Sequence, residues 1–187
     1  QSVVNGAAIA RQSVWFKFRA KNNQRFLLRL SAEALDSRLD PVVYLRNEAG
    51  ERIARAGTNG LIDHTPVADG DFYVQVHDAA FSGGQEYFFR LELTKGPHVD
   101  FVYPPVFNDL KESEVTLFGR NLPNSKPSMF QGGDGRNLER VTIKAGALTR
   151  AELPGGVVLP PASIVLDGGV YRLVSDGVTS NPFFVAH

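Results

Sequence analysis

The chain has 187 residues, of which 43% are apolar, and its 20 Lys and Arg residues balance 20 Asp and Glu residues. This is the composition of a globular protein rather than a disordered one, and it carries no overall charge to attract nucleic acid. Cysteine is absent, which excludes disulfides, a thiolate nucleophile and a cysteine metal site. No apolar run approaches the roughly 20 residues of a membrane-spanning helix, so we expect no membrane insertion.

Alternation of apolar and polar residues dominates the first half of the chain and is typical of half-buried β-strands. A turn signal at residues 47–50 ends in glycine and precedes another extended run. One short helical turn is expected over residues 31–35, with Ser31 as its N-cap. The predicted strands of this half cover residues 14–20, 26–30, 41–45, 51–55, 72–76 and 87–93.

The strand pattern stops at Lys95-Gly96-Pro97 and then restarts. Residues 123–136 and 153–156 are rich in Pro, Gly, Ser or Asn and are interpreted as loops, so the glycine run 132–135 is not expected to follow a strand. Later strands are predicted at residues 99–105, 115–119, 141–143, 163–166, 170–174 and 183–185. This pattern predicts an all-β protein with two tandem β-sandwich domains, residues 1–95 and 97–187.

The linker between the two predicted domains is very short. Pro97 fixes one backbone angle and little slack remains, so we predict a rigid contact between the domains. The large apolar side chains nearest to this boundary would line the contact. These are Phe101, Tyr103 and Phe107 from the second domain, with Phe88 or Trp15 as partners from the first.

Residues 5–93 resemble the bacterial pre-peptidase C-terminal (PPC) domain family. The matching segments, in the family's order, are 5–6, 15–20 with 24–25, 39–45, 49–54, 68–76 and 87–91. The resemblance implies a jelly-roll-like β-sandwich appended to a larger secreted protein. Since no signal peptide opens the sequence, and residues 1–6 are interpreted as an internal position of a longer protein, a secreted, periplasmic or cell-surface location follows from the resemblance alone.

Residues 97–187 resemble an immunoglobulin-like module of the IPT/TIG kind. Three segments match: the proline-bearing strand at 102–105, the segment 116–122 that ends in Gly-Arg-Asn-Leu, and the closing turn and strand at 176–185. This resemblance implies a second sandwich with an accessory, adhesive or spacing role. Other domains of the parent protein would then be natural partners.

No set of residues predicts catalysis. The four histidines include His64 and His77, each next to an aspartate, but neighbouring residues of a strand point to opposite faces. No motif supplies a nucleophile held beside a base, and no phosphate-binding loop is present. We therefore expect a non-catalytic protein without a cofactor.

Calcium is the one metal that the sequence brings into consideration. The weak candidate ligands, which share a carboxylate side chain and a position near strand ends, are Asp63, Asp69, Asp71 and Asp78. Structural turns explain these aspartates better. Members of the PPC family often carry acidic residues where this chain has Gln12 and Val14, so calcium is the less favoured alternative.

Strand alternation predicts that several aromatic side chains point away from the core. The candidate ligand-binding residues are Trp15, Tyr44, Tyr73 and Phe88. Outward aromatic rings form platforms for sugars and proteins, but they also occur scattered or covered by a neighbouring domain, and the sequence favours this second interpretation. Arg19, Arg25 and Arg29 are interpreted as a solvated face rather than a polyanion site.

Two functional hypotheses follow. The first is a rigid spacer or docking unit of a larger secreted bacterial protein. The second is a module that binds extracellular polysaccharide or protein through the outward aromatics, with calcium as a candidate aid. The exposure of Trp15 separates them, because a binding platform must be open to solvent.

Overall fold

The computed structural model describes residues 2–57, 60–106, 113–151, 167–175 and 177–186. The chain divides into two compact units, Gln1–Lys95 and Gly96–His187. Each described sheet takes its strands from one unit only. Within the described residues, no helix is both long and apolar enough to span a membrane. Each unit is described below by itself.

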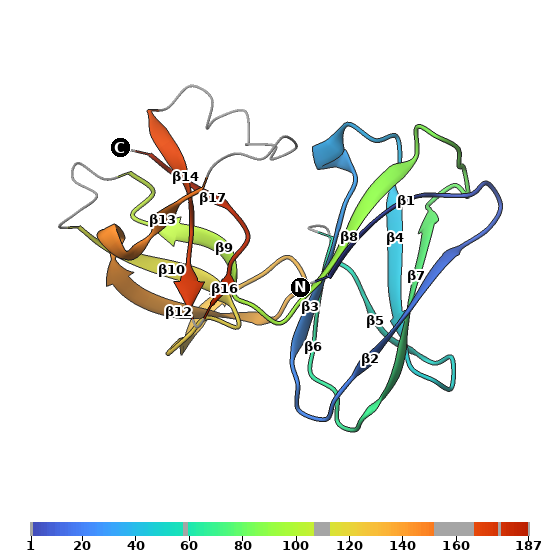
Figure 1. Ribbon diagram of the computed structural model, residues 1–187, viewed down its shortest axis with the longest axis horizontal. Coiled ribbons are helices and arrows are strands. Elements are labelled where there is room, and N and C mark those ends of the chain that lie inside the picture. Colours follow the sequence, from blue (N-terminus) through green and yellow to red (C-terminus); the bar gives the residue numbers. More distant parts are fainter. Residues whose placement is uncertain (1, 58–59, 107–112, 152–166, 176, 187) are drawn as a thin grey trace. The chain divides into compact units, whose positions relative to one another are not determined.

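Unit 1 contains two four-stranded antiparallel sheets, with strand orders β1-β8-β3-β6 and β2-β7-β4-β5 (Figure 1). Eight strands paired in this way form a double-sheet jelly roll. The all-β sandwich predicted from the sequence is therefore confirmed. The strands are β1 (Ser2–Ala7), β2 (Val14–Ala20), β3 (Phe26–Ser31), β4 (Pro41–Arg46), β5 (Arg52–Arg55), β6 (Leu61–His64), β7 (Gly70–Asp78) and β8 (Phe88–Thr94).

The core of unit 1 lies between these two sheets and takes alternate residues from β2, β3, β4, β7 and β8. From β4 and β7 come Val43, Leu45 and residues 72, 74 and 76, while β3 and β8 supply the opposing Phe and Leu side chains. Phe18 of β2 meets Phe26 of β3 edge to face, with 5.0 Å between ring centroids. Because these positions are inward, the residues between them on β2, β7 and β4 point outward.

Two local features of unit 1 differ from the sequence expectation. The short helix is a 3₁₀ helix, Glu33–Leu35, that follows Ala32 and has no side-chain cap. Ser31 ends strand β3 and is not an N-cap, because it pairs with Arg90 of β8. Strands β1 and β6 also have no counterpart in the predicted pattern, since neither shows a clean alternation of apolar and polar residues.

Unit 2 places a four-stranded sheet, β11-β12-β10-β9, against a three-stranded sheet, β13-β14-β17. Val115 and Leu117 of the first sheet share one core with Tyr171 and Val185 of the second. The strands are β9 (His98–Tyr103), β10 (Glu114–Arg120), β11 (Lys126–Gln131), β12 (Asn137–Lys144), β13 (Thr149–Arg150), β14 (Gly168–Arg172), β15 (Val174–Ser175), β16 (Val178–Thr179) and β17 (Phe183–Ala186). A second 3₁₀ helix covers Ala145–Ala147, and the strand predicted at 163–166 lies outside the described residues.

The segment 123–136, interpreted from sequence as a long loop, contains strand β11 and forms a hairpin with β12. The expectation was wrong because β11 is a sheet-edge strand, mostly exposed, with an irregular register, so its composition resembles that of a loop. The glycine run 132–135 is the turn of this hairpin. A Cβ atom on Gly132 would collide with the guanidinium of Arg120, so the turn needs glycine there.

The turn after β7 is organised by the buried carboxylate of Asp78, which is 4% exposed. It accepts backbone N–H groups from Asp40, Ala80 and Ser82, each at 3.0 Å. Burial acts to raise the pKa of Asp78, but these donors outweigh it, so the pKa lies below its ordinary value. The ionised carboxylate thus stabilises the folded state.

Replacing Asp78 by Asn is expected to lower the free energy of unfolding of unit 1 by about 1–3 kcal/mol at neutral pH, because the amide keeps only one of the two acceptor oxygens and at least one backbone N–H loses its acceptor. The folded pKa is depressed, so the wild-type carboxylate stabilises above about pH 4 and this contribution is lost as pH falls through the folded pKa. Urea unfolding followed by the fluorescence of Trp15, the single tryptophan, measures this. Equal stability losses at neutral and strongly acidic pH would contradict the assignment.

Unit 2 has a buried cation in Arg120, which is 1% exposed. Its two terminal nitrogens donate to the two oxygens of Asp134 at 2.8 and 2.7 Å, and Asp100 lies 3.6 Å from its Nε. Burial acts to raise the pKa of Asp134, but the hydrogen bonds from Arg120 and from the backbone N–H of Arg136 outweigh it and lower this pKa. The hairpin turn is thereby tied to β10.

Replacing Asp134 alone by Leu is expected to destabilise unit 2 by about 3–5 kcal/mol, because a buried guanidinium loses its main partner. The double variant Arg120→Met/Asp134→Leu should regain part of this loss, because no buried cation then remains, although Asp100 loses its neighbouring charge. Calorimetry measures both, with the Trp15 signal identifying the unit 1 transition. Additive losses in the double variant would contradict a dependence on the ion pair.

Candidate functional site

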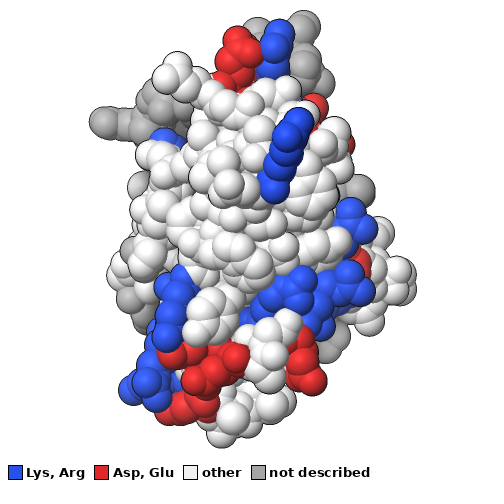
Figure 2. Space-filling view, turned by 90° about the vertical axis from the view of Figure 1, so that its right-hand side faces the viewer, with Lys and Arg blue, Asp and Glu red and all other residues white. Residues whose placement is uncertain are grey.

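The outer face of sheet β2-β7-β4-β5 carries aromatic and basic side chains in two neighbouring rows. The strand register places Trp15, Gln75, Tyr44 and Arg55 in one row. It places Lys17, Tyr73, Arg46 and Arg52 in the next. Figure 2 shows one face of the molecule, on which basic side chains gather beside acidic ones next to a broad area without charged groups. The two rows point outward because the residues that alternate with them along the same strands are packed in the core.

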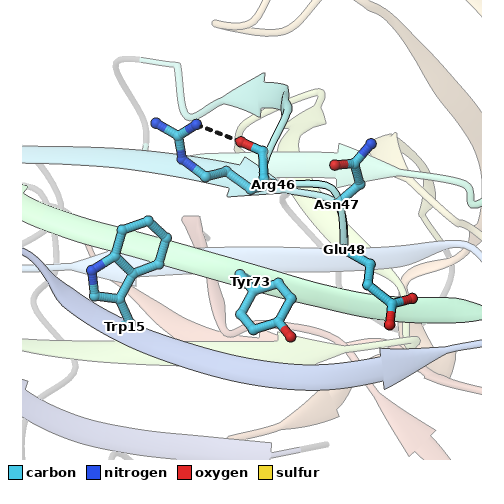
Figure 3. A pocket seen from close by; sticks show the side chains of 6 residues that line it. Trp15, Arg46, Asn47, Glu48 and Tyr73 are labelled. Atoms are coloured by element: carbon cyan, nitrogen blue, oxygen red, sulfur yellow. Dashed lines mark hydrogen bonds between the residues drawn. The ribbon is translucent and has the colours of Figure 1, made fainter.

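A hollow of about 280 Å³ opens on this outer face. Figure 3 shows Trp15 and Tyr73 on neighbouring strands below Arg46, with Glu48 on the far side of Tyr73. Trp15 is 50% exposed, and its ring lies 5.9 Å from the guanidinium carbon of Arg46. The hollow is lined by Trp15, Arg46, Asn47, Glu48, Gly50 and Tyr73.

Arg46 is fixed in the hollow by hydrogen bonds. Its Nε donates to Oε1 of Gln75 at 2.8 Å, and a terminal nitrogen donates to the carbonyl oxygen of Gly50 at 2.8 Å. Gln75 in turn donates to the hydroxyl of Ser13 at 3.0 Å. Gly50 has a φ of 81°, a left-handed conformation that glycine adopts at low cost in the β4–β5 turn. The guanidinium is therefore positioned before any ligand arrives.

Three arginines surround the ring of Tyr44, and we call Arg46, Arg52 and Arg55 the arginine cluster. Their guanidinium carbons lie 5.9, 5.2 and 6.0 Å from the Tyr44 ring centroid, within the range of cation–π attraction. Arg52 and Arg55 are exposed. Among the described residues, no carboxylate forms an ion pair with any of the three.

Lys17 of β2 and Asp71 of β7 form an ion pair beside the aromatic residues of the outer face. Nζ of Lys17 lies 2.7 Å from Oδ2 of Asp71 and 5.6 Å from the ring centroid of Tyr73. Hydrogen bonding to Asp71, and then to Tyr73, raises the pKa of Lys17, and the hydrogen bond from Lys17 lowers the pKa of Asp71. Both side chains are therefore charged at neutral pH, and the positive charge of Lys17 balances the negative charge of Asp71.

The structure brings Trp15, Tyr44 and Tyr73 together on one outer face but places Phe88 elsewhere. Phe88 lies opposite Ala7 in sheet β1-β8-β3-β6 and is 37% exposed. The sequence analysis did not select Arg46, Arg52 or Arg55. Alternation along β4 predicts the outward position of Arg46, but Arg52 and Arg55 are three residues apart on β5 and would point to opposite faces by alternation alone. The irregular register of the β4–β5 pair places both opposite outward residues of β4, Arg46 and Tyr44.

The residues proposed to line a domain contact have neighbours within unit 2. Phe101 stacks on Phe118 at 4.6 Å and meets Phe130 edge to face at 5.7 Å. Tyr103 is 65% exposed. Phe107 lies outside the described residues, and the predicted rigid contact stays a prediction.

The candidate calcium ligands do not converge. Arg25 binds Asp63 through two hydrogen bonds at 2.8 and 2.6 Å, and Asp69 accepts the backbone N–H of Asn22 at 2.7 Å. Asp71 pairs with Lys17, and Asp78 accepts three backbone N–H groups, as described above. Across the described residues, no group of three or more His, Cys, Asp or Glu side chains is arranged to hold a metal.

The Asp–His neighbours are not arranged as catalytic pairs. His64 packs against the rings of Phe26 and Phe72, at 5.5 and 5.7 Å. His77 is buried, stacks on Phe81 at 4.3 Å, and places Nδ1 2.9 Å from the carbonyl oxygen of Asp78. Both imidazoles thus make structural contacts.

No model of a protein family matches the sequence, and no curated protein matches it significantly. Among solved structures, the chain is similar to PliG of Aeromonas hydrophila, described as a periplasmic lysozyme inhibitor of g-type lysozyme. The identity is 14% and the TM-score 0.40, over 50% of this chain and 85% of PliG. It is also similar to the pre-peptidase C-terminal domain of a collagenase from Bacillus anthracis, with 15% identity and a TM-score of 0.39, over 50% of this chain and 88% of that domain. Both likenesses are weak and assign no function to the chain.

Calcium is expected to leave the melting temperature of unit 1 unchanged, because each candidate aspartate is already engaged by a cation or by backbone N–H groups. Thermal unfolding followed by Trp15 fluorescence, in a chelator and then in millimolar calcium, measures this, with magnesium as the matched control ion. A saturable rise of several degrees with calcium alone would show that a calcium site exists.

Proposed function

We propose that the chain is a non-catalytic binding module of a larger secreted protein, and that it binds an extracellular polysaccharide in the hollow. The exposure of Trp15 carries this proposal. A tryptophan that is half exposed beside a fixed arginine favours a binding platform over a purely spacing role, because a platform needs an aromatic ring that is open to solvent.

The hollow suits the mixed surface of a sugar. Sugar rings present flat C–H faces, which pack on aromatic rings such as those of Trp15 and Tyr73, and a rim of hydroxyls. Arg46, Asn47 and Glu48 provide donors and acceptors for that rim. Two of these three polar groups are held by hydrogen bonds, Arg46 as described above and Asn47 through its contacts with Glu51, so little ordering is required on binding.

The same lining supports binding without cleavage. Hydrolysis of a glycosidic bond generally uses two carboxylic groups on opposite sides of the bond. Glu48 is the one carboxylate among the described residues that line the hollow. An extracellular location rests on the resemblance of residues 5–93 to PPC domains, which are appended to secreted proteins.

Replacing Trp15 by Ala is expected to weaken polysaccharide binding about tenfold or more, because a buried ring contact contributes roughly 1.5–3 kcal/mol. A glycan array with the intact chain identifies ligands, and isothermal titration then measures the affinity of each variant. Phe88→Ala is the matched control, because Phe88 is an exposed aromatic of the other sheet. If both variants lost binding equally, or if the intact chain bound no glycan, the proposed site would be wrong.

A further inference from the structure

If the proposed function holds, the surface also indicates the charge of the polysaccharide that it binds. We propose that the polysaccharide is acidic, and that the arginine cluster binds its carboxylate or sulfate groups while Trp15 and Tyr73 pack against its sugar rings. The anion site lies on β4 and β5, beside the hollow on the same outer face.

The first support is a concentration of like charge. Arg46, Arg52 and Arg55 converge on the single ring of Tyr44, and within the described part of the chain none of them pairs with a carboxylate. Three neighbouring cations repel one another, and a bound anion relieves this repulsion. The planar guanidinium also matches carboxylate and sulfate oxygens with two parallel donors.

The second support is that the cluster is arranged in advance. The Tyr44 ring attracts all three guanidinium groups, and Arg46 is additionally fixed by Gln75 and Gly50. Like charges on flexible side chains would otherwise spread into solvent. Held together, they lose little conformational freedom when an anion binds.

The third support is continuity between the cluster and the hollow. The guanidinium carbon of Arg46 lies 5.9 Å from the Trp15 ring and 5.9 Å from the Tyr44 ring, so one residue belongs to both sites. The four strands from β2 to β5 span about 14 Å at roughly 4.8 Å per strand. A surface of this width fits several units of a polymer better than a single small anion.

The geometry favours a glycan over an acidic peptide. Peptides commonly bind sheets by adding a strand to an exposed edge, where backbone groups are free to pair. This surface lies on the face of a sheet, and its central strands β7 and β4 are hydrogen-bonded on both sides. Its recognition groups are therefore aromatic rings and guanidinium groups rather than backbone amides.

The test compares polymers that differ in charge alone. Binding of the intact chain is titrated with polygalacturonate and with its neutral methyl ester, and in a second arm with dextran sulfate and with dextran. The acidic polymers are expected to bind at least about tenfold more tightly, and more weakly as salt rises. The arm with the larger difference identifies carboxylate or sulfate as the preferred group.

The variant Arg52→Gln/Arg55→Gln is expected to lose about tenfold or more in affinity for the acidic polymer, with little change for the neutral one. Both side chains are exposed, and melting temperature checks that the variant folds. The control Arg38→Gln/Arg90→Gln removes the same charge from residues that contact Glu86 and Asn5, and it should bind like the wild type.

Each contrary outcome has a separate meaning. Equal binding of acidic and neutral polymers, lost in Trp15→Ala, would overturn the acidic ligand but leave the proposed function intact. Binding of no polysaccharide would overturn both. Poly-glutamate bound as tightly as the acidic glycans would also overturn the inference, because the surface would then recognise acidic polypeptides.

Discussion

In unit 1, Phe16, Val74 and Leu45 are register partners on three adjacent strands and face the opposite sheet. Val74 and Leu45 are wholly buried, and Phe16 packs against the same cluster. Because side chains alternate along a strand, filling this inner row forces the two flanking rows outward. A shift of one residue in the register would exchange core and surface and would cost most of the core. The burial requirement of the sandwich thus holds Trp15, Tyr73 and Tyr44 on one outer face.

Two buried charged side chains stabilise turns that lie outside the apolar cores. Asp78 collects backbone N–H groups in the turn after β7, and Arg120 ties the β11–β12 hairpin to its neighbouring strand. In both cases a charge removed from water is satisfied by several hydrogen bonds, which is the condition under which burial of a charge is tolerated. These contacts are local to each unit and separate from the outer face that carries the hollow.

Strand alternation predicted the sandwich, the inward residues of β2, β4 and β7, and the outward direction of Trp15, Tyr44 and Tyr73. It could not predict that Phe88 lies on the other sheet, because a strand's sheet depends on pairing between distant segments. The convergence of Arg46, Arg52 and Arg55 on one ring has a different origin, the irregular register of the β4–β5 hairpin, which alternation does not reveal. Strand β11 was missed for a different reason: an exposed edge strand has little apolar patterning to reveal it.

The β4–β5 hairpin has a further consequence for how the outer face can diversify. Residues 46–50 and Arg52 contribute most of the polar groups at the hollow and the arginine cluster, and they follow one another in sequence. Their chemistry therefore depends on one short connection that projects from the sandwich, whereas the aromatic floor is built into the sheet itself. Substitutions in this segment can change the polar groups at the hollow while the inward core residues stay the same. The jelly roll thus separates the residues that its core requires from surface residues of one short connection, which can vary independently of that core.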